Sequence, residues 1–185
     1  TGYGIVIADV DNECGKDAAA QIEGAGGKAA YCHVDVTDRA AVAHAIGLCQ
    51  EKFSFIHAIV NNAGFNKPQH FSETTEENWG QIMRVNGLGV LIGMQEAAKA
   101  MIAAGNKGKI VNTASIAGRS GDPQWAPYCA SKAAVLSLTQ ARARGLAKHG
   151  ITVNAFAPGV VETELWDRLD QDLMELGVTS SPGQA

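Results

Sequence analysis

The sequence predicts an α/β fold in which a doubly wound parallel sheet carries helices on both faces. Five short apolar runs recur along the 185 residues, and the stretches between them are long and periodic enough to be helices. Each run is apolar on consecutive residues, as is typical of strands buried on both faces. The expected strands cover residues 4–8, 29–34, 55–60, 109–114 and 151–157. Ligands are therefore expected beyond the carboxyl ends of these strands.

The first two helices have recognisable ends. Gly26 and Gly27 are expected to close the helix that follows Asn12, because glycine tolerates the left-handed conformation of a helix end. The next helix is expected to begin at Thr37 or Asp38, whose side chains can accept hydrogen bonds from free backbone N–H groups.

Two longer helical stretches are expected over residues 76–104 and 126–149. Both are rich in Ala and other small residues, which permits close packing. The packing partner is either another helix at a subunit interface or the sheet itself.

A chain of 185 residues with 46% hydrophobic and 18% charged residues predicts one domain. The net charge of -4, without any basic run, gives no electrostatic footprint for nucleic acid or for an anionic membrane. No apolar stretch approaches the roughly 20 residues that span a bilayer, and the first residues lack the charged flank of a signal peptide. We therefore expect a cytoplasmic protein with a small-molecule partner.

Four cysteines are scattered along the chain as Cys14, Cys32, Cys49 and Cys129. They form no C-x-x-C pair and have no His at metal-ligand spacing, so neither a zinc site nor a redox motif is expected. The cysteines are expected to be ordinary reduced thiols, and no metal is predicted.

The start of a complete dinucleotide-binding fold is not found in this sequence. Such a fold begins with a strand, a Gly-rich turn and a helix whose amino end holds the pyrophosphate. Residues 1–4 look like a remnant of that turn but are followed by the strand 5–7. We therefore expect residues 1–185 to be a single domain that lacks its first strand and Gly-rich turn, and also its last strand.

Tyr128 and Lys132 stand at the start of a strongly helical segment, one turn apart, with Cβ atoms about 5–6 Å from each other. A phenol with a pKa near 10 is a poor base at neutral pH, and a nearby ammonium group favours its ionised form. Ser115 follows the strand 109–114, where it can hydrogen-bond a reacting oxygen. On its own, a Y-x-x-x-K pair arises often on a solvated helix face, and Ser115 could be a simple turn residue.

Together with their surroundings, these residues resemble the short-chain dehydrogenase/reductase family, whose fold is Rossmann-like. The resemblance covers essentially the whole chain. Three further motifs stand in the family's order: N-N-A-G at 61–64, R-V-N-G at 84–87 and P-G-V-V-E-T at 158–163. Coincidence at all of these positions is very improbable.

The resemblance implies a catalytic role for each of four residues. Tyr128 would be the general acid/base that takes the hydroxyl proton as hydride leaves for the cofactor. Lys132 would lower the pKa of Tyr128 and hydrogen-bond the nicotinamide ribose, and Ser115 would orient the substrate oxygen. Asn86 would hold a water that connects Lys132 to solvent, although it could instead be a polar residue that merely interrupts a helix.

The resemblance also implies NAD as the cofactor. Asp9 ends the first expected strand, where a carboxylate accepts the ribose hydroxyls of the adenosine and repels a 2′-phosphate. A surface Asp at a turn is the plainer alternative, and Asp11 competes for the role. Asp35 matches the family's adenine-side Asp, with helix capping before Thr37 as the alternative.

The resemblance implies further cofactor contacts, in which Asn62 and Gly64 would line the path from the adenine ribose to the nicotinamide. Thr163 would hydrogen-bond the carboxamide, unless it is a simple N-cap for the helix that follows. The full set of implied cofactor residues is Asp9, Asp35, Asn62, Gly64, Tyr128, Lys132, Pro158, Gly159, Val161 and Thr163.

Residues 164–170 lie where the family places its substrate flap, and they look like those of sorbitol-type polyol dehydrogenases. Trp166 in this segment, and Asn66, Gln124 and Trp125 on nearby loops, are the expected substrate contacts. An aromatic wall beside acids and an Arg suits a hydroxyl-rich molecule, since its hydroxyls need partners when they leave water. Trp166 could equally pack an amphipathic helix onto the core.

The sequence thus favours an NAD-dependent oxidoreductase that acts on a secondary alcohol of a small polyol. Acetoin or butanediol is the runner-up substrate, and a 3-oxoacyl reductase is a third reading that Asp9 argues against, because such enzymes normally prefer NADP. A catalytically silent cofactor-binding scaffold is the alternative outside enzymes. The resemblance implies a homotetramer through the two long helices, with no nucleic acid and no membrane as partner.

Overall fold

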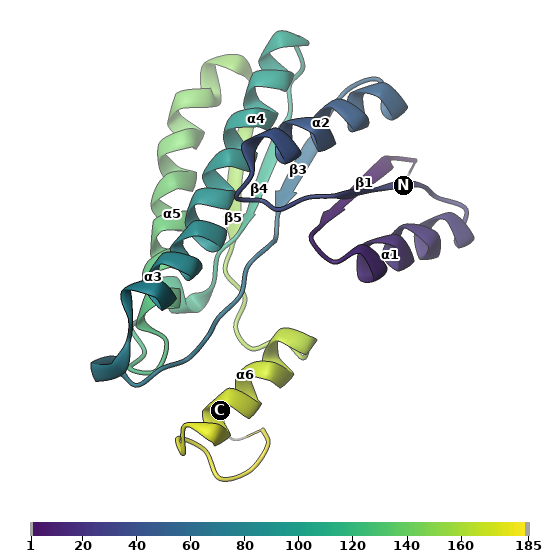
Figure 1. The fold of residues 1–185 in the computed structure, drawn as a ribbon. Helices are drawn as coiled ribbons and strands as arrows, with labels where there is room; N and C mark the ends of the chain where they lie inside the picture. The colour runs from purple at the N-terminus through teal and green to yellow at the C-terminus, as the bar shows by residue number, and fades with distance from the viewer. Residues whose placement is uncertain (1, 184–185) are drawn as a thin grey trace.

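The computed structural model describes residues 2–183, and it confirms an α/β fold with parallel strands (Figure 1). The first half contains β1 (Gly4–Asp9), α1 (Asn12–Gly24), β2 (Lys28–His33), α2 (Arg39–Phe53), β3 (Ala58–Asn61), the short helix η1 (Phe71–Glu73), α3 (Glu76–Ile82), the π-helical segment η2 (Met83–Gly89) and α4 (Val90–Ala103). The second half contains β4 (Lys109–Thr113), η3 (Ile116–Gly118), α5 (Ala126–Leu146), η4 (Ala147–His149), β5 (Thr152–Phe156) and α6 (Glu164–Glu175). Thr1 and Ala185, the ends of the expected domain, lie outside the described residues.

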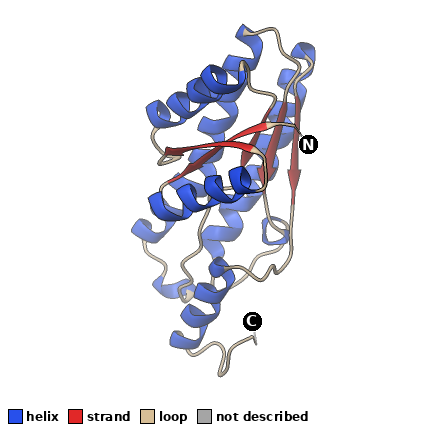
Figure 2. Ribbon diagram, turned by 90° about the vertical axis from the view of Figure 1, so that its right-hand side faces the viewer, coloured by secondary structure: helices blue, strands red, loops and turns tan. Residues whose placement is uncertain are grey.

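The five strands form two sheets. β1 pairs with β2, and β3, β4 and β5 pair in that order, with every pair parallel. Figure 2 shows the β1–β2 pair crossing the direction of the three-stranded sheet. The expected strands are therefore all present, within a few residues of their expected bounds, but the described residues hold no strand that joins β1 to β3 in one sheet.

The three-stranded sheet is the centre of the hydrophobic core. α4 and α5 stand side by side against it in Figure 1, and α5 packs on β5 while α4 packs on β3. Met94, Met101, Ile110 and Val135 are among the residues that are completely or almost completely buried there. α1 packs on β1 and β2, away from this core. The carboxyl ends of β3, β4 and β5 meet at one edge, and the loop after β5 leads from that edge to α6 (Figure 1).

Helix ends largely follow the sequence expectation. Asp38, and not Thr37, caps α2, since its side chain accepts from the N–H groups of Ala40 and Ala41. The helix after Asn12 ends at a glycine with φ of +80°, Gly26, as expected.

The long helix expected over 76–104 is interrupted. Residues 83–89 within it form η2, a π-helix, whose hydrogen bonds span one residue more than those of an α-helix. Gly89 allows this segment to pack closely against the loop between β2 and α2, because a Cβ there would lie 2.7 Å from Cγ2 of Val36. The helix expected over 126–149 is α5 followed by the single 3-10 turn η4.

None of the helices among residues 2–183 has the length and apolar character needed to cross a membrane.

Candidate active site

The first turns of α5 carry Tyr128 and Lys132 to the carboxyl end of β4. Lys132 is buried, with 4% of its surface exposed, and its Nζ donates a 2.8 Å hydrogen bond to the backbone oxygen of Thr113. The same Nζ lies 5.5 Å from the centre of the Tyr128 ring. Because Thr113 is the last residue of β4, this bond fixes the ammonium group at the edge of the sheet where ligands bind in parallel folds.

Burial dominates the ionisation of both groups. It lowers the pKa of the Lys132 ammonium from 10.5 to about 8, because a charge is poorly solvated there. It raises the pKa of the Tyr128 phenol, and a hydrogen bond from Ser115 opposes this increase only in part. Desolvation of the phenolate is therefore the largest influence on the Tyr128 pKa, and the lowering of this pKa by Lys132 stays a prediction.

Ser115 is buried directly after β4, at the amino end of η3. Its Oγ accepts a hydrogen bond of 3.2 Å from Ala117 N, and its side chain is also within hydrogen-bonding reach of Tyr128. Gly118 lets this turn approach α5, since a Cβ there would lie 2.8 Å from the carbonyl carbon of Lys132. Ser115, Tyr128 and Lys132 are thus brought together, as the sequence predicts.

Asn86 lies in η2 and is fully buried. Its Oδ1 accepts from Phe65 N at 3.0 Å, and its Nδ2 donates to Phe65 O at 2.9 Å and to Ser131 Oγ at 3.1 Å. The side chain therefore holds the loop after β3 against α5. A Cβ on Gly64 would stand 3.2 Å from Asn86 Oδ1 and 3.5 Å from Lys132 Nζ, so this loop passes close to both groups.

A second set of buried polar groups lies deeper in the sheet. Asn61 Nδ2 donates to Asn112 Oδ1 at 2.8 Å, and Asn112 Nδ2 donates to Thr139 Oγ1 at 2.9 Å. These bonds cross from β3 to β4 and from β4 to α5. At the strand end, Thr113 Oγ1 also donates to Oδ1 of Asn62, which ties the expected cofactor-facing turn to β4.

The acidic side chains expected to contact the cofactor are exposed. Asp9 ends β1, and its Oδ1 accepts from Asp11 N at 2.9 Å. Asp11 itself caps α1 by accepting from the backbone N–H groups of Glu13 and Cys14, so its side chain is engaged in the fold. Of these two candidate carboxylates, Asp9 accepts fewer hydrogen bonds from the fold than Asp11 does.

Asp35 accepts from Thr37 N at 2.8 Å, and this bond lowers the pKa of its carboxyl group. The bond forms a tight turn just before α2. Because Asp38 makes the cap of that helix, the alternative reading of Asp35 as a helix cap does not describe the structure.

The loop after β5 lies beside the Ser115 turn. Ile116 N donates to Pro158 O at 3.1 Å, and a Cβ on Gly159 would lie 3.7 Å from Cδ1 of Ile116. Val161 is exposed, and Thr163 Oγ1 donates to its backbone oxygen at 3.4 Å. Thr163 occupies the N-cap position of α6, but its side chain makes no capping hydrogen bond.

Three of the four expected substrate residues come from neighbouring loops. Gln69 N donates to Gln124 O at 2.9 Å, which joins the loop containing Asn66 to the loop that leads into Trp125 and α5. Asn66 Oδ1 is buried and has no hydrogen-bond partner among residues 2–183.

Trp166, the fourth, belongs to α6. It lines a hollow of about 520 Å³ together with acidic side chains. These acids are Glu162, Glu164, Asp167 and Asp170.

The sequence did not single out three groups that hold the site together. They are the backbone oxygen of Thr113, the backbone of Phe65 and the hydroxyl of Ser131. Thr113 and Ser131 stand inside segments already marked by their neighbours, and Phe65 follows the N-N-A-G motif directly. Each acts through a backbone group or a small hydroxyl, and such groups leave no pattern of their own in a sequence.

A family model described as short chain dehydrogenase matches residues 1–174. Sorbitol dehydrogenase of Cereibacter sphaeroides is 42% identical over 169 residues, which cover 91% of this chain and 65% of that protein. L-2,3-butanediol dehydrogenase of Corynebacterium glutamicum is 41% identical over 179 residues, covering 95% and 69%. The chain thus spans about two thirds of the length of these relatives.

Solved structures agree with this likeness. NAD+-bound xylitol dehydrogenase superposes with a TM-score of 0.88 at 30% identity, over 94% of this chain and 67% of that one. Gluconate 5-dehydrogenase of Burkholderia cenocepacia J2315, solved with NADP and tartrate, gives a TM-score of 0.84 at 36% identity, over 92% and 66%.

Proposed function

The chain belongs to the short-chain dehydrogenase family, and from this premise we propose that the protein is an oxidoreductase that moves a hydride between a nicotinamide cofactor and a secondary alcohol or ketone. The observation that carries the proposal is the gathering of Ser115, Tyr128 and Lys132 at the carboxyl edge of the sheet. A cofactor-binding scaffold would not require all three.

The proton chemistry centres on the Tyr128 hydroxyl. Because burial raises its pKa, the phenol is protonated at neutral pH and suits proton donation to a ketone oxygen. In the direction of alcohol oxidation it must take a proton, and a cation at about 5 Å favours the phenolate by roughly 3 kcal/mol at an effective dielectric of about 20. Lys132 supplies that cation, and Ser115 orients the substrate oxygen.

Asn86 would hold a water between Lys132 and solvent. A Cβ on Gly64 would lie 3.2 Å from the Asn86 side-chain oxygen and 3.5 Å from Lys132 Nζ, and this shared neighbour supports the role. The Asn86 amide nitrogen already donates to Phe65 and Ser131, and its Oδ1 already accepts from Phe65 N, so the water would donate to the second lone pair of Oδ1 or to the backbone oxygen of this residue.

The residues present fit a nicotinamide nucleotide, which supplies the hydride acceptor when bound. Asp9 is exposed at the end of β1, and no group among residues 2–183 donates a hydrogen bond to its Oδ2, so this oxygen can accept ribose hydroxyls. A carboxylate there repels a 2′-phosphate, which favours NAD over NADP. The other proposed contacts are Asp35, Asn62, Gly64, Pro158, Gly159, Val161 and Thr163.

We propose a small polyol as the substrate. The names of the relatives include sorbitol and butanediol dehydrogenases, and that of a structural neighbour is xylitol dehydrogenase. Asn66 contributes a buried, unpartnered oxygen beside the loop of Gln124 and Trp125, and such a group suits a substrate hydroxyl. Trp166 would close the site from α6. Acetoin or butanediol is the second candidate.

A substrate panel tests these assignments. Steady-state rates with NAD and with NADP would be measured on sugar alcohols, vicinal diols and 3-hydroxyacyl thioesters. The highest kcat/KM is expected for a sugar alcohol with NAD. A kcat/KM for butanediol more than about tenfold higher, or a thioester as the best substrate, would reject the polyol assignment. Absence of turnover with every alcohol would favour the scaffold.

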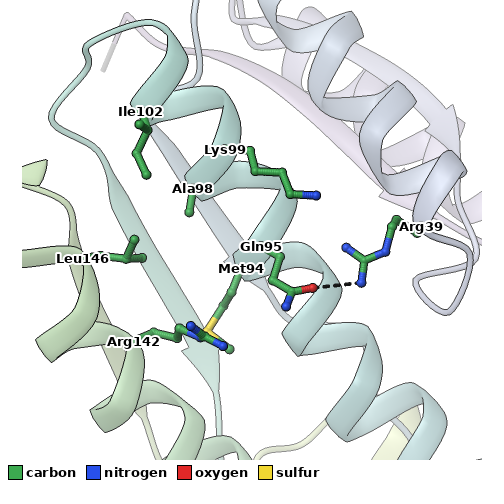
Figure 3. Close-up of a pocket in the computed structure, with 8 residues that line it drawn as sticks. All are labelled: Arg39, Met94, Gln95, Ala98, Lys99, Ile102, Arg142 and Leu146. Carbon is green, nitrogen blue, oxygen red and sulfur yellow. Dashed lines mark hydrogen bonds between the residues drawn. The ribbon is translucent and has the colours of Figure 1, made fainter.

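We also propose that the protein is a homotetramer assembled through α4 and α5. The outer side of these helices carries a groove of about 440 Å³, and Figure 3 shows the residues that line it. Its apolar part includes Ile102, which is 41% exposed, and its rim includes Arg39, held by Gln95 at 2.8 Å. Sedimentation should show a smaller assembly for Ile102→Asp, whereas Leu165→Asp, at an equally exposed residue of α6, should not change it. The cytoplasmic location expected from the sequence stays a prediction.

A further inference from the structure

Ser131 lies between Tyr128 and Lys132 on α5 and is completely buried. Its Oγ donates a 2.7 Å hydrogen bond to the backbone oxygen of Tyr128 and accepts one of 3.1 Å from Asn86 Nδ2. A helical serine that bonds to a carbonyl of its own helix is ordinary. The second bond comes from η2, 45 residues earlier in the chain, and it needs a packed tertiary structure.

The Ser131 hydroxyl is the last member of a continuous set of hydrogen bonds. Asn86 accepts from the backbone N–H of Phe65 and donates to its backbone oxygen, and Phe65 follows Gly64, where a Cβ would lie 3.5 Å from Lys132 Nζ. The first turn of α5 is thus attached at two points. One is the Lys132 ammonium on β4, and the other is the Ser131 hydroxyl on η2.

We propose that Ser131 is a positioning residue, whose hydroxyl sets the turn that carries Tyr128 and Lys132 against the loop after β3. It acts through Asn86 and through the Tyr128 carbonyl, and it does not touch the reacting atoms. The inference rests on the proposed oxidoreductase function.

The same helix contains an internal comparison. Thr139 Oγ1 donates to Val135 O at 2.7 Å and accepts from Asn112 Nδ2 at 2.9 Å, so it makes the same two kinds of bond as Ser131. Thr139 lies two turns farther along α5, away from Tyr128. If such a hydroxyl serves stability alone, removal of either one should have the same consequences.

The kinetic test compares variants that differ only in a hydroxyl. Ser131→Ala should lower kcat by about tenfold or more while the KM for cofactor and for alcohol stays within about threefold. The reason is that Tyr128 and Lys132 are displaced, whereas the binding of cofactor and alcohol is largely kept. Ser131→Thr keeps a hydroxyl that can bond to the same carbonyl, whereas Ser131→Val has the same shape without it. The Thr variant should be at least about tenfold faster than the Val variant, which keeps the test valid if the Ala variant folds poorly.

Two control variants accompany them. Thr139→Val should lower the melting temperature and leave kcat within about twofold of the wild type. Ser137→Ala, at an exposed residue of α5, should change neither quantity.

A measurement without cofactor gives a second readout. The titration of Lys132, expected near pH 8, would be followed by NMR of ¹³Cε-labelled lysine and assigned by its loss in Lys132→Met. In Ser131→Ala and Ser131→Val the midpoint should rise towards 10.5, because a loosened turn exposes the ammonium group to water, and in Thr139→Val it should not move.

Equal kcat in the Thr and Val variants of Ser131, or an unmoved Lys132 midpoint in Ser131→Ala and Ser131→Val, would overturn the proposal. A wild type without turnover on any alcohol would instead refute the proposed function. The titration would then still decide the role of Ser131.

Discussion

The first turns of α5 and the strand pair β1–β2 both carry residues expected to meet ligands, but they are held in different ways. Around α5, polar side chains are buried and bonded across the fold, as in the bonds of Asn86 to Ser131 and of Lys132 to Thr113. Around β1, Asp9 and Asp11 are exposed and bond to backbone groups two or three residues away.

This contrast separates two tasks. Proton transfer needs its groups fixed in place before the substrate arrives, and buried long-range bonds provide that rigidity. A carboxylate that selects a cofactor needs only to be open to it. Changes near α5 should therefore affect the rate or stability strongly, whereas changes near β1 should mainly affect which cofactor is used.

The largest difference is expected between two variants that each lose a tyrosine hydroxyl, one near α5 and one near β1. Tyr128→Phe should reduce turnover by about 1000-fold or more while cofactor binding stays close to unchanged, because only the proton-transfer group is lost. Tyr31→Phe removes a hydroxyl that bonds to Asp9 O and Asn12 Oδ1 at 3.1 Å, and it should leave kcat within about twofold. Steady-state kinetics and cofactor titration measure both. A Tyr128→Phe enzyme with a tenth of the wild-type kcat would refute the assignment.

The next effect concerns the pH dependence of stability. The pKa of Lys132 is lowered from 10.5 to about 8 in the folded protein, so the unfolded chain binds more protons between these two pH values. The free energy of unfolding should therefore rise with pH over this window, relative to Lys132→Met, by up to about 3 kcal/mol. Chemical denaturation of both proteins at several pH values measures this difference. A constant difference from pH 7.5 to 10.5 would mean that Lys132 is not buried as an ammonium group.

Smaller changes in stability are expected when either of two helical glycines is replaced by alanine. A Cβ on Gly93 in α4 would lie 2.1 Å from Asn61 Oδ1, so Gly93→Ala must displace the Asn61–Asn112 pair and should destabilise the protein by about 1–3 kcal/mol. A Cβ on Gly47 in α2 would meet no atom from outside its own helix turn within 4 Å among residues 2–183, and Gly47→Ala should stabilise the protein by about 0.5–1 kcal/mol through helix propensity. Thermal unfolding of the two variants should show shifts of opposite sign. Shifts of the same sign would contradict the close packing at Gly93.

The smallest effect is expected at β1. Asp9→Ala should narrow the preference for NAD over NADP by about tenfold, mainly by weakening NAD, since both the hydrogen bonds to the ribose and the repulsion of a 2′-phosphate are lost. Asp17→Ala, at an exposed position of α1, serves as the control and should leave the ratio unchanged. Measured kcat/KM ratios decide the matter, and a wild type that already uses both cofactors equally well would disprove the role of Asp9.

Much of the fold was predictable because it depends on local patterns. The apolar runs predicted all five strands, and Asp38 and Gly26 gave helix ends. Ser115, Tyr128 and Lys132 were recognisable because their spacing follows from the strand end and the helix turn that carry them.

The supporting bonds were not predictable from such patterns. The pair Asn61–Asn112 depends on the register of β3 against β4, and Asn112–Thr139 depends on how α5 lies over the sheet. The partners are separated by 51 and 27 residues in the chain, and nothing local links them. The division into two sheets is also a property of long-range pairing.

The π-helical segment η2 has a consequence for insertions and deletions. An α-helix advances by about 100° per residue, so the extra residue in this turn sets the rotation of α3 relative to α4. Deleting one residue within 83–89 would let the three segments run as one regular α-helix, but it would turn Ile82 out of the core if α4 stayed in place. It would also carry Asn86 away from Phe65. The loss of even one residue from this segment should therefore disturb the packing on both of its sides, in addition to the constraints that the contacts of Asn86 and Gly89 place on its composition.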